Sequence, residues 1–121
     1  MLFRSAGISS LALHPNGQSL ASGSPDQTVV LWDLRKAEAI ERLSMPGIAP
    51  LDVMFAADGK TLLASTSQGT IRFWEFPSGR QLRQLQMTEL MPFRLAPSPE
   101  GRHVATGMRN GTIHLLRLGE K

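Results

Sequence analysis

The sequence predicts an all-β fold built from three repeated units, each a small antiparallel sheet. Two observations carry this prediction: a fixed internal repeat, and short apolar runs separated by turn residues, with no helical period. An interval of 42 residues separates the members of three sets of equivalent residues, which are Gly17, Gly59 and Gly101, then Thr28, Thr70 and Thr112, then Trp32, Trp74 and Leu116. Self-similarity at this length indicates stacked supersecondary units.

Each unit is expected to contain four strands, of which the first two meet at a tight turn. In the first repeat, the first strand is expected over residues 8–13 and ends at His14-Pro15-Asn16-Gly17. Proline pre-sets the turn, and glycine accepts the positive φ that follows. The second strand is rich in small residues, which let neighbouring sheets approach closely. Its expected ranges are 19–23, 61–65 and 103–107.

The other two strands of each unit differ in polarity. A two-residue hairpin of type I′ leads into the third strand, most clearly at Asn110-Gly111. The third strand is the most apolar, with the sequences TVVLWDL, TIRFWEF and TIHLLRL, as expected for a strand covered on both faces. The fourth strand, at about residues 37–44 and 81–87, is polar and therefore suits an outer edge.

Four-stranded sheets repeated about every 40–45 residues predict a β-propeller with radially arranged blades. The dipeptide Trp32-Asp33 ends the third strand of the first repeat, and Trp74-Glu75 is a near match in the second. With these residues the chain resembles the WD-repeat β-propeller family over essentially its whole length. The expected domain is one propeller segment, residues 1–121, with blades at roughly 6–36, 37–78 and 79–121 and a candidate ring-closing outer strand at 1–5.

Members of this family often carry a buried tetrad of His, Ser or Thr, Asp and Trp. The resemblance places Ser22, Asp26 and Trp32 in the first repeat, with the His position at about Arg4. The equivalent residues of the other repeats are Ala64, Gln68 and Trp74, then Thr106, Asn110 and Leu116. No repeat has the full set, so apolar repacking is expected in the second and third repeats, because a half-satisfied buried network is unfavourable.

The number of strands suggests an incomplete ring. The last repeat stops at Lys121 without an outer strand, and known propellers use about four to eight blades. Two explanations stay open. The sequence is a piece of a longer propeller, or two or more chains self-associate, the opening strand of one completing the last blade of another. An open monomer would leave two apolar blade faces in water.

Composition gives little indication of a nucleic-acid or membrane partner. The net charge is +3, and the seven Lys or Arg residues from Arg80 onward are spread over strands and loops, so nucleic acid is not expected. The absence of cysteine excludes disulfides and thiolate metal sites. No stretch approaches the ~18 apolar residues of a membrane span, and no signal peptide is recognisable. The expected location is the cytoplasm.

No constellation of residues predicts catalysis, a metal or a cofactor. His14, His103 and His114 lack the spacing and the neighbouring carboxylates of a metal site. Asp58 and Glu100 occupy turn positions, and the glycine-containing turns lead into strands rather than into the helix that a phosphate loop needs. The chain is therefore not expected to be an enzyme.

Loops on one rim of the propeller are the predicted binding surface. They are unusually apolar and contain methionine, which adapts to varied partners. The candidate partner-binding residues are Met45, Met91, Phe93, Arg109 and Pro25. By resemblance, the expected function is a non-enzymatic scaffold for protein–protein interaction. The alternative is a regulatory propeller segment of a larger multidomain signalling enzyme.

Overall fold

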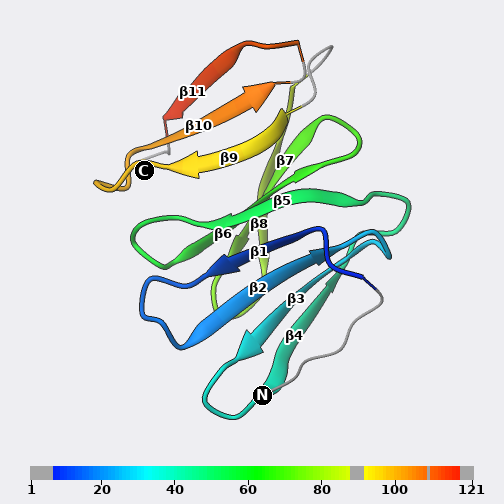
Figure 1. Ribbon diagram of the computed structural model, residues 1–121, viewed down its shortest axis with the longest axis vertical. Helices are drawn as coiled ribbons and strands as arrows, with labels where there is room; N and C mark the ends of the chain where they lie inside the picture. The colour runs from blue at the N-terminus through cyan, green and yellow to red at the C-terminus, as the bar shows by residue number, and fades with distance from the viewer. Residues whose placement is uncertain (1–6, 88–91, 109, 118–121) are drawn as a thin grey trace.

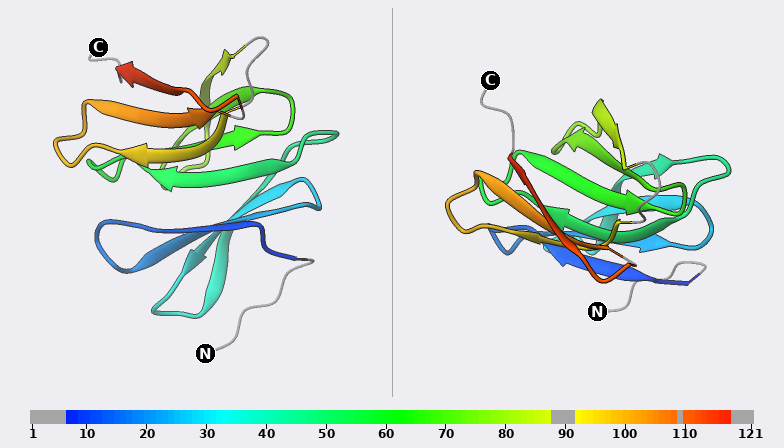
Figure 2. Two further views of the ribbon diagram at one scale, coloured as in Figure 1. Left: turned by 45° about the horizontal axis from the view of Figure 1, so that its top comes forward. Right: turned by 90° about the horizontal axis from the view of Figure 1, so that it is seen from above.

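The computed structural model describes residues 7–87, 92–108 and 110–117. Within these ranges the chain forms three antiparallel sheets stacked one on the next, which fan out from neighbouring inner strands (Figures 1 and 2). The sheets formed by the described residues do not close into a ring. No helix among the described residues is long and apolar enough to cross a membrane.

The strands follow one another in sequence order within each sheet. The first sheet consists of β1 (Ser10–Leu13), β2 (Ser19–Ser24), β3 (Thr28–Asp33) and β4 (Glu38–Ser44). The second consists of β5 (Pro50–Phe55), β6 (Thr61–Thr66), β7 (Thr70–Glu75) and β8 (Gln81–Gln86). The third consists of β9 (Pro92–Pro97), β10 (His103–Met108) and β11 (Ile113–Arg117). The prediction of all-β, propeller-like blades is confirmed.

The hydrogen-bonded sheets are offset from the predicted blade ranges. Strand β4 pairs with β3 from Thr28↔Ser44 to Asp33↔Glu38, so residues 38–44 belong to the first sheet and not to the second. Strand β8 pairs with β7 in the same way. The predicted boundaries place each outer strand in the blade that follows it. In the structure, each outer strand instead pairs with the third strand that precedes it in the chain. The predicted ring-closing strand at 1–5 lies outside the described residues.

In the first two sheets, the hairpins between the second and third strands are one residue longer than predicted. Ser24 pairs with Thr28, which leaves the three-residue loop 25–27, and the N–H of Gln27 donates to the carbonyl oxygen of Ser24 over 3.1 Å. Gln27, Gly69 and Gly111 all have positive φ, at 76°, 77° and 92°. A three-residue loop needs one left-handed residue at its end, whereas the predicted type I′ turn needs two.

Most of the core lies between the sheets. The larger cluster joins the first and second sheets, and its members are Ala21, Val29, Leu31, Leu43, Met45, Val53, Phe55, Leu62, Ala64 and Trp74. The smaller cluster joins the second and third sheets, and its members are Met54, Ala56, Leu63, Ile71, Phe73 and Val104. The apolar third strands therefore contribute to both faces of the second sheet, as their sequences predict.

Glycine and histidine bring the first two sheets into close contact. A Cβ atom on Gly23 would lie 3.3 Å from two side-chain carbons of Pro50 and 3.4 Å from Val53, so the missing side chain allows β5 to approach β2. At the other end of the strands, His14 Nε2 lies 2.8 Å from the carbonyl oxygen of Gly59. The His14 ring also packs 4.9 Å from the ring of Phe55. The predicted close approach through small residues is confirmed at Gly23.

Candidate interaction surface

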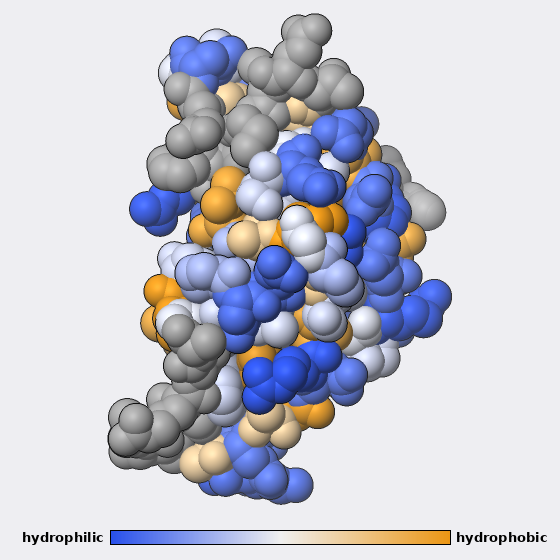
Figure 3. Space-filling model, turned by 90° about the vertical axis from the view of Figure 1, so that its right-hand side faces the viewer, coloured by the Kyte–Doolittle hydropathy of each residue, from blue (hydrophilic) through white to orange (hydrophobic). Residues whose placement is uncertain are grey.

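Three loops form one end of the first two sheets, and we call them the rim: the hairpin loops 25–27 and 67–69 and the connecting loop 45–49. Figure 3 looks onto the side of the molecule that carries these loops, where hydrophilic and hydrophobic side chains intermingle. Pro25, Pro46 and Ser67 are exposed there. The rim therefore offers a mixed surface of polar and apolar groups.

Hydrogen bonds hold the connecting loop of the rim from both sides. The N–H of Met45 donates to the carbonyl oxygen of Gln27, and the N–H of Gly47 donates to the side-chain oxygen of Gln27, each over 2.8 Å. From the second sheet, Ser67 Oγ accepts from the N–H of Ala49 over 3.0 Å, and the N–H of Ser67 donates back to the Ala49 carbonyl over 2.8 Å. The rim is thus fixed by its own contacts.

The structure describes only some of the predicted partner-binding residues, and it places them in different environments. Pro25 is exposed at the rim. Met45 is fully buried in the core cluster, so the prediction that its side chain meets a partner is wrong: it fills space beneath the loop instead. Met91 and Arg109 lie outside the described residues, as does the side chain of Phe93, and the predicted cluster of these three stays a prediction.

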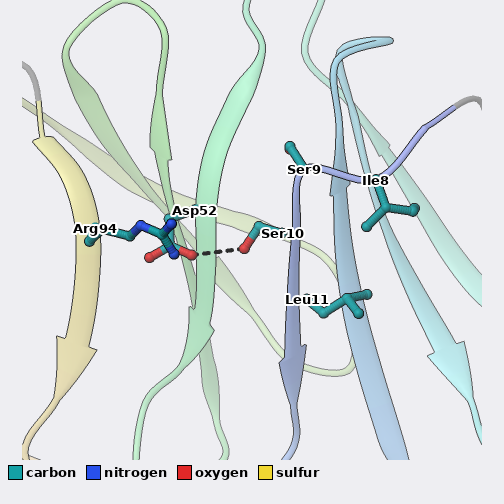
Figure 4. A pocket seen from close by; sticks show the side chains of 6 residues that line it. All are labelled: Ile8, Ser9, Ser10, Leu11, Asp52 and Arg94. Atoms are coloured by element: carbon teal, nitrogen blue, oxygen red, sulfur yellow. Dashed lines mark hydrogen bonds between the residues drawn. The ribbon is translucent and has the colours of Figure 1, made fainter.

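Sequence reasoning missed a second feature, at the inner strands. Ser10, Asp52 and Arg94 stand at the same place in three successive repeats and come from β1, β5 and β9. Together with Ile8, Ser9 and Leu11 they line an open hollow of about 340 Å³ (Figure 4). The 42-residue interval would have found this set, because equivalent residues of neighbouring inner strands lie side by side.

Asp52 connects all three sheets. One of its oxygens accepts from Ser10 Oγ over 2.8 Å, and the other accepts from the N–H of Leu95 in β9, also over 2.8 Å. Figure 4 shows the Arg94 side chain lying beside the same carboxylate. The first sheet contributes a similar contact, since Ser10 Oγ accepts from the N–H of Val53 over 3.0 Å. This carboxylate is therefore engaged in holding the inner strands together, a structural role.

Part of the family tetrad forms in the first repeat. Trp32 Nε1 donates to Ser22 Oγ over 2.9 Å, and both residues are buried. Asp26 is exposed and accepts from Thr28 Oγ1 over 2.6 Å, and this hydrogen bond lowers the pKa of the Asp26 carboxyl. In the second repeat, Trp74 packs in the core beside Ala64, which agrees with the expected apolar repacking.

The turn glycines have the conformation that the sequence predicts. Gly17, Gly59 and Gly101 all have positive φ, at 73°, 73° and 83°. Gly59 carries a second constraint, because a Cβ atom there would lie 2.8 Å from the ring of His14. Among the described residues, no group of three or more His, Asp or Glu side chains is placed to hold a metal ion.

The repeats and their geometry agree with a known family. The model of the WD domain, G-beta repeat, matches residues 3–33 and 47–75. The chain belongs to the WD-repeat family. The two matches cover the repeats that end in Trp32-Asp33 and Trp74-Glu75. The third repeat, where Leu116-Arg117 stands instead, shares the 42-residue spacing and forms a sheet of its own. No match was found among curated proteins. WD repeats are generally protein-interaction modules.

Proposed function

We propose that this chain is a non-enzymatic protein-binding platform whose partner, a protein, contacts the rim. The observation that supports this most directly is the connecting loop 45–49, which is tied to Gln27 on one side and to Ser67 on the other. A surface that is already ordered loses little conformational entropy on binding. Loops on a rigid scaffold are also where binding residues concentrate.

The proposed contact residues are Pro25, which is exposed at the rim, together with Met91, Phe93 and Arg109. Met45 supports the loop from beneath and is not among them. An aromatic ring, a flexible thioether and a guanidinium are groups that often anchor protein interfaces. The cytoplasm stays the proposed place of action.

Site-specific photocrosslinking in cells tests the platform. A photoreactive residue at Pro25 or Gln68, both exposed at the rim, is expected to trap the same partner protein. Lys36 and Lys60 are matched controls, because both are exposed in loops at the opposite end of the strands. Trapping of that partner from the control positions alone, or from both ends equally, would contradict the proposal.

Loss of the proposed anchors should then weaken the complex. Met91→Ala combined with Arg109→Ala is expected to reduce binding of the trapped partner while leaving the melting curve unchanged. Unchanged affinity would remove these two residues from the interface. The alternative, a regulatory segment of a larger signalling enzyme, is decided by whether a catalytic domain is encoded in the same reading frame.

A further inference from the structure

The third sheet has an apolar face that points away from the second sheet. Ile113 and Leu115 of β11 lie on it, and their side chains are 74% and 71% exposed. They alternate with His114 and Leu116, of which Leu116 packs toward the second sheet. Two large aliphatic side chains exposed on one strand mark a candidate contact surface.

The repeat shows what normally covers such a face. Counting back 42 residues from Ile113 and Leu115 leads to Ile71 and Phe73 of β7, which are 0% and 3% exposed. Those two side chains are buried in the cluster between the second and third sheets, together with Val104. The same repeat positions are therefore an interface between sheets wherever a further sheet is present.

Gly107 of β10 leaves room for the same kind of contact. It is the repeat equivalent of Gly23, whose missing side chain lets Pro50 and Val53 of the next inner strand approach. A Cβ atom on Gly107 would meet nothing within 4 Å. Ser65, at the equivalent position of the second sheet, is also a small residue and is 0% exposed, so this repeat position carries a small residue or glycine at both internal interfaces. Glycine inside a strand often marks close approach of another backbone.

The first sheet carries the complementary half. Leu11 and Leu13 of β1 are each 61% exposed, and Figure 4 shows Leu11 pointing away from β5. Their repeat equivalents, Val53 and Phe55, are 3% and 5% exposed and lie in the cluster against the first sheet. One chain therefore exposes both sides of the contact that its own internal interfaces use.

We propose that a second copy of this chain docks on the outer face of the third sheet through the inner strand of its first sheet. The internal interface gives the register. Gly23 approaches Val53 and pairs with Val29, so the equivalent contact brings Leu11 of the second copy to Gly107 and Ile113. Leu13 of that copy then lies at the level of Leu115. Since each copy offers both faces, two copies can dock reciprocally in a closed two-fold assembly.

The docked contact is weaker than the internal ones. In the first two sheets, Ser10 and Asp52 each accept an N–H from the next inner strand, at 3.0 Å and 2.8 Å. Arg94 stands at this position in β9, and a guanidinium donates hydrogen bonds and cannot accept one. We therefore expect the dimer to be reversible, with a population that rises with protein concentration.

Measuring the solution mass of the wild-type chain and of three matched variants tests the proposed contact. Light scattering coupled to size exclusion, over about a hundredfold range of concentration, should show the 121-residue chain moving from one copy to two. Gly107→Val and Ile113→Lys should each weaken the dimer by at least about tenfold with an unchanged melting curve at low concentration. Ile40→Lys, at an exposed apolar residue of β4, should leave the dimer intact. A monomer throughout, or a dimer that both variants leave unchanged, overturns the proposal.

Crosslinking tests the register in the same wild-type background, which contains no cysteine. A mixture of Leu11→Cys and Ile113→Cys chains should give a covalent pair of the two variants. A mixture of Ile40→Cys and Leu82→Cys chains, with both positions on outer strands, should not. Equal yields from both mixtures would contradict the register. Neither experiment involves the rim. The proposed dimer and the proposed partner-binding rim can therefore each be disproved without affecting the other.

Discussion

Ile71 and Phe73 of the second sheet occupy the same repeat positions as Ile113 and Leu115 of the third, yet the first pair is buried and the second pair is largely exposed. The strands have the same type of sequence and the same pairing with a small-residue strand. The two pairs differ in what packs against them. The third sheet covers Ile71 and Phe73, whereas no described residues cover Ile113 and Leu115 in the same way. Burial in a stacked fold is thus a property of the interface rather than of the strand.

The test of this comparison with the largest expected effect on stability pairs Trp74→Ala with Leu115→Ala. Trp74 is 3% exposed in the cluster between the first and second sheets, so its truncation should destabilise the chain by about 3–5 kcal/mol. Leu115 is 71% exposed, and its truncation should change stability by less than about 0.5 kcal/mol at low concentration. Thermal and urea unfolding measure both. Equal effects would mean that the two positions are not buried as described.

The sequence alone was sufficient to predict these strands. Turn glycines, small-residue second strands and apolar third strands are local signals, and each falls in the expected place. It could not predict that Gln27 ends a three-residue hairpin, because the loop contains neither the Asn-Gly pair of the shorter turn nor a glycine at its left-handed position. The sequence also led to the wrong prediction for Met45, because the residues of a loop do not show whether a methionine side chain points outward or into the core.

A second test compares two strand glycines at equivalent positions. Gly23→Val should destabilise the chain by about 1–3 kcal/mol, because the new side chain would press on Pro50 and Val53. Gly107→Val should be neutral or slightly stabilising in the monomer, since nothing lies within 4 Å of the added Cβ and valine favours strands. Urea unfolding at low concentration measures the difference. A similar loss in both variants would remove the distinction between a covered and an open face.

Asp52→Asn tests how the inner strands are held together. The carboxylate accepts from Ser10 and from the N–H of Leu95, and an amide replaces one of its acceptor oxygens with a donor. We expect a loss of about 1–2 kcal/mol, because one part-buried hydrogen bond between the sheets loses its acceptor. Asp58→Asn is the matched control in an exposed turn, where the Asp58 carboxylate accepts from the backbone N–H of Lys60. An equal loss at Asp58 would contradict the connecting role of Asp52.

The inner-strand set shows why the site was harder to predict than the fold. Ser10, Asp52 and Arg94 share a repeat position but differ in chemistry, so no motif identifies them. Only the spacing links them, and only the stacking of β1, β5 and β9 shows that a carboxylate there serves neighbouring backbones. Repeat spacing predicts which residues become neighbours, and the hydrogen-bond partners of those residues must come from the structure.

The smallest effect concerns the rim, where Gln27 and Gly69 occupy equivalent left-handed positions with φ of 76° and 77°. Gly69→Gln should destabilise by about 1 kcal/mol, because a side chain is strained in that left-handed region. Gln27→Gly relieves this strain but removes the acceptor of the Gly47 N–H, so unfolding stability should change by less than about 0.5 kcal/mol.

Hydrogen exchange separates these two contributions where the melting curve does not. In Gln27→Gly the amide of Gly47 should exchange faster, while the amide of Ser67, which donates to the Ala49 carbonyl, should keep its protection. Unchanged exchange at Gly47 would mean that the loop does not depend on Gln27. Faster exchange with unchanged stability would show that the Gln27 side chain orders the rim, which is the surface proposed to bind, although its backbone position is strained.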